Sequence, residues 1–242
     1  ADMEKESLRN NIDLAIRYVT QNHPVGAYAV DEINCEIGTS SGQPAVAVVI
    51  SYLHGRSEIL RIKQTQNMDE AMTVIAATLD GHDAGVILRI ERYQETDFAQ
   101  LVSDYAADNP DAVMETPQVT ALIYPESGTD RVVELMFTYQ TSRQTLRSMQ
   151  SNVQPVFQSA ELYVRGEASE SEKYSQLYSF LMTRYDYHIN TSITPAYSLL
   201  RHGVGDSKAF ATVYAAMCRR AGLNCQVVSG TKDGEARFWN IV

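Results

Sequence analysis

The sequence predicts an α+β protein. Some segments repeat apolar residues with the period of an amphipathic helix, others alternate them like a half-buried strand, and the two kinds are mixed instead of strictly alternating. With 242 residues, 44% of them apolar and 21% charged, the chain suffices for one large domain or two modest ones, each with its own core. We therefore expect a globular fold and not a disordered one.

The first predicted helix begins at Ser7, a residue type that favours helix N-caps, and its apolar stripe runs to the His23-Pro24 pair. Two β-rich runs follow, at residues 45–53 and 58–63. Because only a short segment that contains Gly55 separates these runs, we expect them to pair as a hairpin.

Five further segments complete the N-terminal part. Helical spacing marks residues 68–79 and 97–107, and strand-like patterns mark residues 85–93, 118–124 and 131–139. The resulting order, β-β-α-β-α-β-β, reads almost the same from either end. This symmetry predicts an internal repeat of two related halves.

A polar segment predicts a domain boundary. Two long helical stretches, at residues 141–164 and 171–187, are separated by residues 165–170, whose composition is typical of linkers between domains. We therefore predict a mixed α/β domain over residues 1–165, which carries the internal repeat, and a second domain over residues 166–242. We identify no family for the first domain.

The charge and hydropathy of the sequence argue against a nucleic acid partner and against a membrane span. The formal net charge is −10, and no dense run of Lys and Arg is present. We therefore expect no nucleic acid partner, because a phosphate backbone attracts basic surfaces. The longest apolar run, residues 45–50, is strand-sized, so we expect no membrane span.

The three cysteines, Cys35, Cys218 and Cys225, are spaced irregularly. Their spacing matches neither a disulfide framework nor the paired ligands of a zinc site. We expect each of them to be a small buried apolar residue. The sequence therefore predicts no metal and no cofactor.

The most informative part of the sequence lies near its C-terminal end. A glycine-rich turn at residues 203–205 leads into a predicted helix at 207–221, which Gly222 ends, and a buried strand follows at residues 225–229. This loop–helix–strand unit resembles the core of transglutaminase-like domains, which share the papain-type fold of cysteine enzymes. The resemblance implies a helix packed on an antiparallel sheet.

Several spaced elements of the family pattern are present in order. In the family a Cys begins the helix, and here Ser207 stands at that position within Gly-Asp-Ser-Lys. A later strand of the family carries His-Ala-Trp-Asn, and here Arg237 stands at the His position while Trp239 and Asn240 match. Tyr197 lies in a small-Tyr-X-Leu-Leu pattern that family members place before the Cys turn.

The resemblance implies a site that has lost the family's chemistry. A helix N-terminus supplies amide donors and partial positive charge, which lower the pKa of a thiol and stabilise an oxyanion. A serine there needs a neighbouring base, but Arg237 stays protonated and cannot accept the proton of Ser207. The family's third residue, an Asp, comes from the next strand, so we expect the domain to continue beyond Val242.

Alternatives stay open for the two substituted positions. Ser207 is most simply the N-cap of its helix or a remnant of the nucleophile; the other interpretations are an engineered replacement of Cys and a working nucleophile. Arg237 can bind an anionic group of a ligand, or it can pair with Asp206 or Asp233. We favour the pairing.

Other polar and aromatic residues near the motif have two interpretations each. His188 and His202 flank the motif and could replace the missing base, although loop histidines are mostly exposed and without special function. Tyrosines are frequent here, and we favour core packing over a concave surface that binds peptide or glycan. They are Tyr163, Tyr174, Tyr178, Tyr185, Tyr187 and Tyr197.

We therefore predict a catalytically inactive transglutaminase-like protein that binds a peptide, a protein or a cell-wall component through the former active-site cleft. The alternatives are an active cysteine peptidase or amidase captured as a Cys-to-Ser variant, and a structural module of a surface assembly. The resemblance also implies a secreted or cell-surface location with the leader removed. The predicted cleft residues are Tyr197, Asp206, Ser207, Arg237, Trp239 and Asn240.

Overall fold

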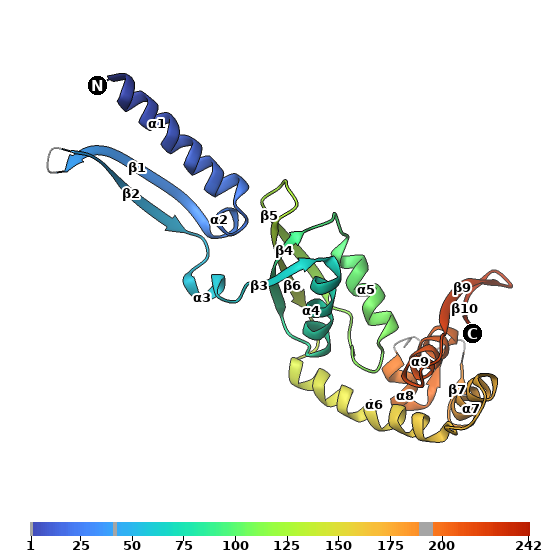
Figure 1. Cartoon of the computed structure of the whole chain (residues 1–242). Coiled ribbons are helices and arrows are strands. Elements are labelled where there is room, and N and C mark those ends of the chain that lie inside the picture. The colour runs from blue at the N-terminus through green and yellow to red at the C-terminus, as the bar shows by residue number, and fades with distance from the viewer. Residues whose placement is uncertain (1, 41–42, 189–195) are drawn as a thin grey trace. The chain divides into compact units, whose positions relative to one another are not determined.

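The structure, a computed structural model, describes residues 2–40, 43–188 and 196–242 (Figure 1). The mixed α+β class is confirmed, and the strands form several small sheets. The chain divides into two compact units. The first comprises Ala1–Thr78, Ala84–Phe98 and Val119–Phe137, and the second comprises Leu79–Asp83, Ala99–Gln118 and Thr138–Val242.

The first unit begins with a helix and a long hairpin (Figure 1). Helix α1 (Asp2–Arg17) continues into a π-helical turn (Tyr18–Asn22) and is followed by the short α2 (Pro24–Ala29), which confirms the first predicted helix. The chain then forms β1 (Val30–Ser40) and β2 (Gln43–Tyr52), which pair antiparallel.

The predicted hairpin between residues 45–53 and 58–63 is wrong. The first run pairs with β1, and the second forms the helical turn α3 (Arg56–Ile59) and a loop. The Glu58 carboxylate accepts a hydrogen bond from the Gly55 amide at 2.8 Å, which closes the helical turn locally. This cap explains why a β-rich run does not become a strand here.

A four-stranded mixed sheet has the strand order β3-β4-β6-β5. The strands are β3 (Lys63–Asn67), β4 (Gly85–Arg92), β5 (Gln118–Tyr124) and β6 (Arg131–Thr138). β3 and β4 run parallel and are connected by α4 (Met68–Asp80), whereas β4 and β6 run antiparallel. The expected helix and the expected strands β4, β5 and β6 are confirmed, whereas β3 was not predicted. The two sides of β4 differ in strand direction, however, so the topology does not support the predicted internal repeat.

Apolar residues of the first unit are buried at the sheet and beside α2. On β4, alternate residues are buried, among them Leu88 and Ile90, as the predicted strand pattern requires. A cluster contains Tyr28, Ala29 and Val132 and joins α2 to β6. The interior of this unit therefore lies at the sheet and at α2.

The second unit is mainly helical and ends in a two-stranded sheet. α6 (Arg143–Tyr163), α7 (Glu170–Met182), α8 (Ala196–His202) and α9 (Ser207–Arg220) pack around one apolar core. The other elements are α5 (Phe98–Asp108), β7 (Asp186–Tyr187), β8 (Val204–Gly205), β9 (Gln226–Lys232) and β10 (Glu235–Ile241). β9 and β10 pair antiparallel, which matches the predicted helix-plus-antiparallel-sheet arrangement.

Helix α6 contributes one face to this core. Leu146, Val153, Phe157 and Ala160 are buried, at the spacing of a helical stripe, in the same cluster as residues of α7, α8 and α9. The packing of the second unit thus begins before the predicted domain boundary at residue 165. That boundary stays a prediction.

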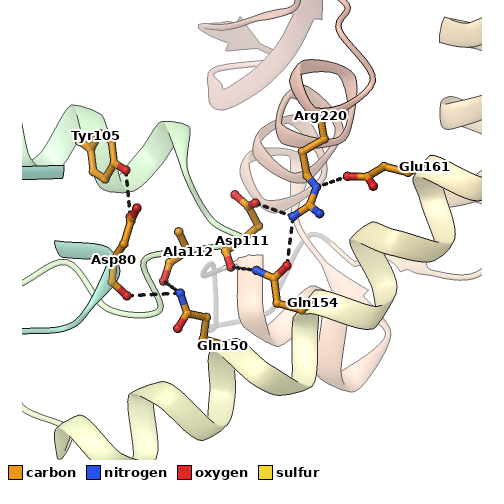
Figure 2. Close-up of polar contacts among 8 residues, drawn as sticks. All are labelled: Asp80, Tyr105, Asp111, Ala112, Gln150, Gln154, Glu161 and Arg220. Atoms are coloured by element: carbon orange, nitrogen blue, oxygen red, sulfur yellow. Dashed lines mark hydrogen bonds and ion pairs between the residues drawn. The ribbon is translucent and has the colours of Figure 1, made fainter. Parts of the chain in front are cut away.

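Polar bonds also hold α6 to α9 (Figure 2). Arg220 of α9 forms ion pairs with Glu161 and Asp111, the latter at 3.0 Å, and donates to Gln154 Oε1 at 3.1 Å. Gln154 Nε2 also donates to the Asp111 carbonyl at 2.8 Å, and Gln150 donates to two further backbone carbonyls. The backbone acceptors are thus bound by the side chains of α6.

Two kinds of feature are absent from the described residues. None of the helices there is both long enough and apolar enough to cross a membrane. No group of three His, Cys, Asp or Glu side chains in the same ranges is placed to hold a metal ion.

Candidate functional site

The candidate site begins at the N-terminus of α9. Asp206 caps this helix, because its carboxylate accepts a hydrogen bond from the Ala209 amide at 2.9 Å. Ser207 is therefore the first helical residue and not the cap, so the N-cap interpretation is wrong and the remnant interpretation stays a prediction. The helix ends before Gly222, whose φ of 74° suits a glycine.

Ser207 contacts the strand that carries the family's His position. The Phe238 amide donates a hydrogen bond to the Ser207 hydroxyl oxygen at 3.2 Å. The N-terminus of α9 therefore lies beside the part of β10 that carries Arg237 and Trp239, as the motif spacing predicts. In this contact the neighbour of Ser207 is a backbone donor and not a base that could take its proton.

Arg237 is engaged within its own strand. Its guanidinium forms an ion pair with Glu235, two residues away on the same face of β10, and donates to the Ala236 carbonyl at 3.0 Å. Glu235, and not Asp206 or Asp233, is thus its ion-pair partner, which corrects the expected pairing. The hydrogen bond to Glu235 raises the pKa of Arg237, so this side chain keeps its proton.

A groove of about 610 Å³ opens at Ser207, lined by residues of α7, α9 and β10. The described residues that line it include no His, Asp, Glu, Lys or Arg. Most of the lining is apolar, and much of it is aromatic. We call it the aromatic groove, after Tyr174, Tyr178, Tyr187, Phe210, Tyr214, Phe238 and Trp239.

Two tyrosines of the aromatic groove are fixed by backbone carbonyls. The Tyr174 hydroxyl donates to the Asn224 carbonyl at 2.5 Å, and the Tyr214 hydroxyl donates to the Tyr174 carbonyl at 3.0 Å. Burial raises the pKa of Tyr214, so its hydroxyl stays protonated and remains a donor. Tyr178, in contrast, is 57% exposed and meets the Tyr214 ring edge-on. A ligand can therefore contact Tyr178 without disturbing the fixed pair.

The two residues that match the family pattern play different parts. Trp239 is 43% exposed, and its ring lies over Gly230 of β9, where a Cβ atom would come within 2.8 Å of it. Asn240 donates to the Ala211 carbonyl at 2.9 Å and to the Cys225 sulfur at 3.4 Å. Asn240 thus joins β10 to α9, whereas Trp239 offers its ring to the aromatic groove.

Five candidate residues do not line the aromatic groove: Asp206 and Arg237, described above, and Tyr197, His188 and His202. Tyr197 of α8 lines a separate pocket of about 320 Å³, together with Lys208 and Thr212. His188 and His202 are exposed and line neither of these pockets. Within the described residues, no histidine therefore stands in for the missing base.

Sequence reasoning missed part of the groove. We favoured a core position for Tyr178 and Tyr187, which are 57% and 48% exposed, and did not single out Met182 or Phe210. The abundance of tyrosine was the available signal. Helical spacing does not separate a residue that faces a core from one that faces a groove, because both lie on an apolar stripe.

The cysteines do not belong to the site. Cys218 and Cys225 are buried free thiols, and their hydrogen bond with each other, together with burial, raises the pKa of Cys218. Neither lines the aromatic groove. Their expected role as buried small residues is confirmed, whereas Cys35 is only half-buried.

These features define a helix-on-sheet domain in which a helix N-terminus presents position 207 to a neighbouring strand. Residues 158–241 match the sequence pattern of the Transglutaminase-like superfamily. The chain therefore carries a transglutaminase-like superfamily domain at its C-terminal end, as its motifs predict, and the preceding region is assigned to no family. In a comparison with curated proteins, nothing matches the chain.

Proposed function

We propose that the C-terminal domain binds extended peptides through the aromatic groove and does not catalyse acyl transfer. One observation carries this proposal. The Ser207 hydroxyl accepts a hydrogen bond from the Phe238 amide, beside a groove whose described lining offers no acid or base. The peptide can belong to another protein or to a cell-wall component.

The proposed loss of catalysis follows from the chemistry of the two substituted positions. A serine becomes a nucleophile only when a base within hydrogen-bond reach removes its proton. Arg237 is charged and paired with Glu235, so it cannot perform this step. Nucleophile and base act as a unit, and the absence of both removes most of the rate.

The aromatic groove has the properties of a peptide-binding surface. Exposed rings such as Tyr178 and Trp239 provide large contact areas, and fixing them costs little conformational entropy. Its volume of about 610 Å³ lies in the range of sites that bind small ligands or a few side chains. On the family resemblance, we further propose that the protein acts outside the cytoplasm.

Fluorescence offers a direct test of binding. Trp239 is the one tryptophan of the sequence, so its emission reports on the aromatic groove. We expect some members of a panel of synthetic peptides rich in aromatic residues or proline to shift this emission saturably. Tyr178→Ala should weaken that binding about tenfold, as truncating a central aromatic contact does.

Tyr18→Ala is the matched control for this experiment. Tyr18 is exposed to nearly the same degree as Tyr178, 58% against 57%, and does not line the groove. The control should bind the peptides as the unchanged protein does. The proposed binding is refuted if no peptide shifts the emission or if both variants lose affinity equally.

The proposed lack of catalysis has its own test. A fluorophosphonate probe labels a serine that a base activates, and we expect no labelling of Ser207. Labelling that disappears in Ser207→Ala would instead identify a working nucleophile and favour the enzyme hypothesis.

A further inference from the structure

The N-terminal arm, which we define as α1, the π-helical turn, β1 and β2, has no interior of its own. None of the side chains at residues 6–22, 30–40 and 45–53 is buried. α1 contacts β1, but Leu8 and Ile12 on the apolar face of α1 stay only half-buried. A two-stranded hairpin with so little cover is at best marginally stable in water.

Strand β2 exposes apolar side chains on both of its faces. Val48 and Ile50 lie on one face and Val49 on the other, because successive side chains of a strand alternate. The exposed apolar residues, with exposed fractions between 37% and 67%, are Val46, Val48, Val49, Ile50, Tyr52 and Leu53. No charged residue occurs at positions 43–53. An edge strand is normally protected by charges, and β2 has none.

Strand β1 differs from β2 in this respect. It carries the exposed carboxylates of Asp31, Glu32 and Glu36, and α1 lies against it. Among the described residues β2 pairs with β1 and with no other strand, so backbone groups along its second edge have no strand partner. The open edge of the N-terminal arm is therefore that of β2 (Figure 1), which carries no charged residue.

We propose that β2 pairs antiparallel with β2 of a second copy of this chain, about a two-fold axis. The product is a four-stranded sheet with the order β1-β2-β2-β1. On one face of this sheet, Val46, Val48 and Ile50 of one copy lie beside the same residues of the other copy. The unpaired backbone groups of the two β2 strands form hydrogen bonds with each other.

Charge and closure favour a second copy as the occupant. Each chain has a formal charge of −10, and two copies repel each other least where the contact contains no charge, as along β2. After pairing, the outer edges of the sheet are the two β1 strands, whose carboxylates oppose further strand addition. The assembly therefore closes as a dimer and does not grow into a fibre.

Sedimentation of the whole chain tests this proposal. We expect a concentration-dependent dimer in buffered physiological salt, and Val49→Lys should weaken the association tenfold or more, because it places a charged lysine from each copy in the otherwise uncharged contact. Asn34→Lys is the matched control. Asn34 lies directly opposite Val49 in the β1–β2 register, so the control adds the same charge at the same height on the outer strand.

The control variant should associate within about threefold of the unchanged protein, since its charge stays in solvent. Hydrogen exchange provides a second readout that does not depend on a variant. Amides of β2 should become better protected as the protein concentration rises, while those of β4 stay constant. A chain that is monomeric up to about 100 μM, well above the Kd of a specific interface of standard size, overturns the proposal. Equal weakening by both variants, or open-ended assembly, also overturns it.

Discussion

The N-terminus of α9 still favours an anion at position 207. Its helix dipole and the Phe238 amide, 3.2 Å from the Ser207 oxygen, both point at this atom. We therefore expect the thiol of Ser207→Cys to have a pKa at least about one unit below its ordinary value of about 8.5. The pH dependence of iodoacetamide alkylation measures it, with peptide mass spectrometry separating position 207 from Cys35.

Adding Arg237→His to Ser207→Cys tests the missing base. We expect the double variant to hydrolyse an activated ester faster than the single variant, because an imidazole can shuttle a proton whereas a guanidinium cannot. Ser207→Cys with Arg237→Gln is the control, since it removes the charge without adding a base. Thiol pKa values near 8.5 in all three would mean that the helix terminus does not act on position 207.

His82 connects pH to the stability of the second unit. It is 1% exposed, its Nε2 accepts a hydrogen bond from the Met114 amide at 3.3 Å, and burial lowers its pKa. As the pH is lowered, the imidazole of His82 is therefore protonated near pH 6.5 in the unfolded chain and only at lower pH in the folded chain. The free energy of unfolding should fall as the pH drops below about 6.5, until the lower folded pKa is reached.

His82→Gln isolates this contribution. Between about pH 7 and about pH 5, the unchanged protein should lose stability relative to the variant, by at most about 1.4 kcal/mol per pH unit. Burial raises the pKa of Asp80, so protonation of this carboxyl group increases the free energy of unfolding as the pH falls, opposite to the effect of His82. Asp80 is present in both proteins. Urea unfolding followed by Trp239 fluorescence gives the difference. Parallel pH profiles of the two proteins would rule out a role for His82.

At the scale of elements, α9 is the centre of the second unit. Its Arg220 pairs with Glu161 and Asp111, all of them at least partly buried (Figure 2). Arg220→Ala leaves both carboxylates without their partner, and we expect it to lower the free energy of unfolding by about 2–3 kcal/mol. Urea unfolding monitored through Trp239 tests this.

The neighbouring Arg219 supplies the control for this prediction. Its contact with Asp108 is 3.9 Å long and more exposed, so Arg219→Ala should change the stability by no more than about 0.5 kcal/mol. Similar losses of stability in the two variants would show that the ion pairs of Arg220 stabilise the fold no more than the exposed contact of Arg219 does.

Elements with local signals were predictable from the sequence. The glycine turn and helix α9 with its end at Gly222 follow from residues close to one another in the chain, whereas the position of β10 beside α9 follows from the family resemblance. The strand β1 was missed because Asp31, Glu32 and Glu36 interrupt its apolar alternation, and the pairing of β2 was misassigned as a result. Strand partners depend on contacts that a local pattern does not record.

The aromatic groove could be predicted only in part, for a related reason. Ser207, Trp239 and Asn240 came from the motif, and all three line the groove. Tyr178 reaches it from α7, and the apposition of α7 and β10 depends on how the helices pack around the core. Tyr197 belongs to the same motif but lies on the side of the second pocket.

At the scale of the whole molecule, the two units are not successive in the sequence. The chain passes between them at positions such as 78–79, 98–99 and 137–138. A cut at the predicted boundary near residue 165 would therefore fall inside the second unit, between α6 and α7. The exposed segment there offers a place to test whether the boundary separates independent domains.

We expect a cut in this segment to leave the protein assembled. A specific protease site inserted after Gly166 is accessible, because Gly166 and Glu167 are exposed and an added side chain at Gly166 meets no neighbour within 4 Å. Once cut, the pieces should still elute together on gel filtration, as the uncut protein does, since Val153 and Phe157 remain buried in the common core. They should separate only in denaturant. Separation under native conditions would instead show that residue 165 ends an independent domain and that the face of α6 is stable without α9.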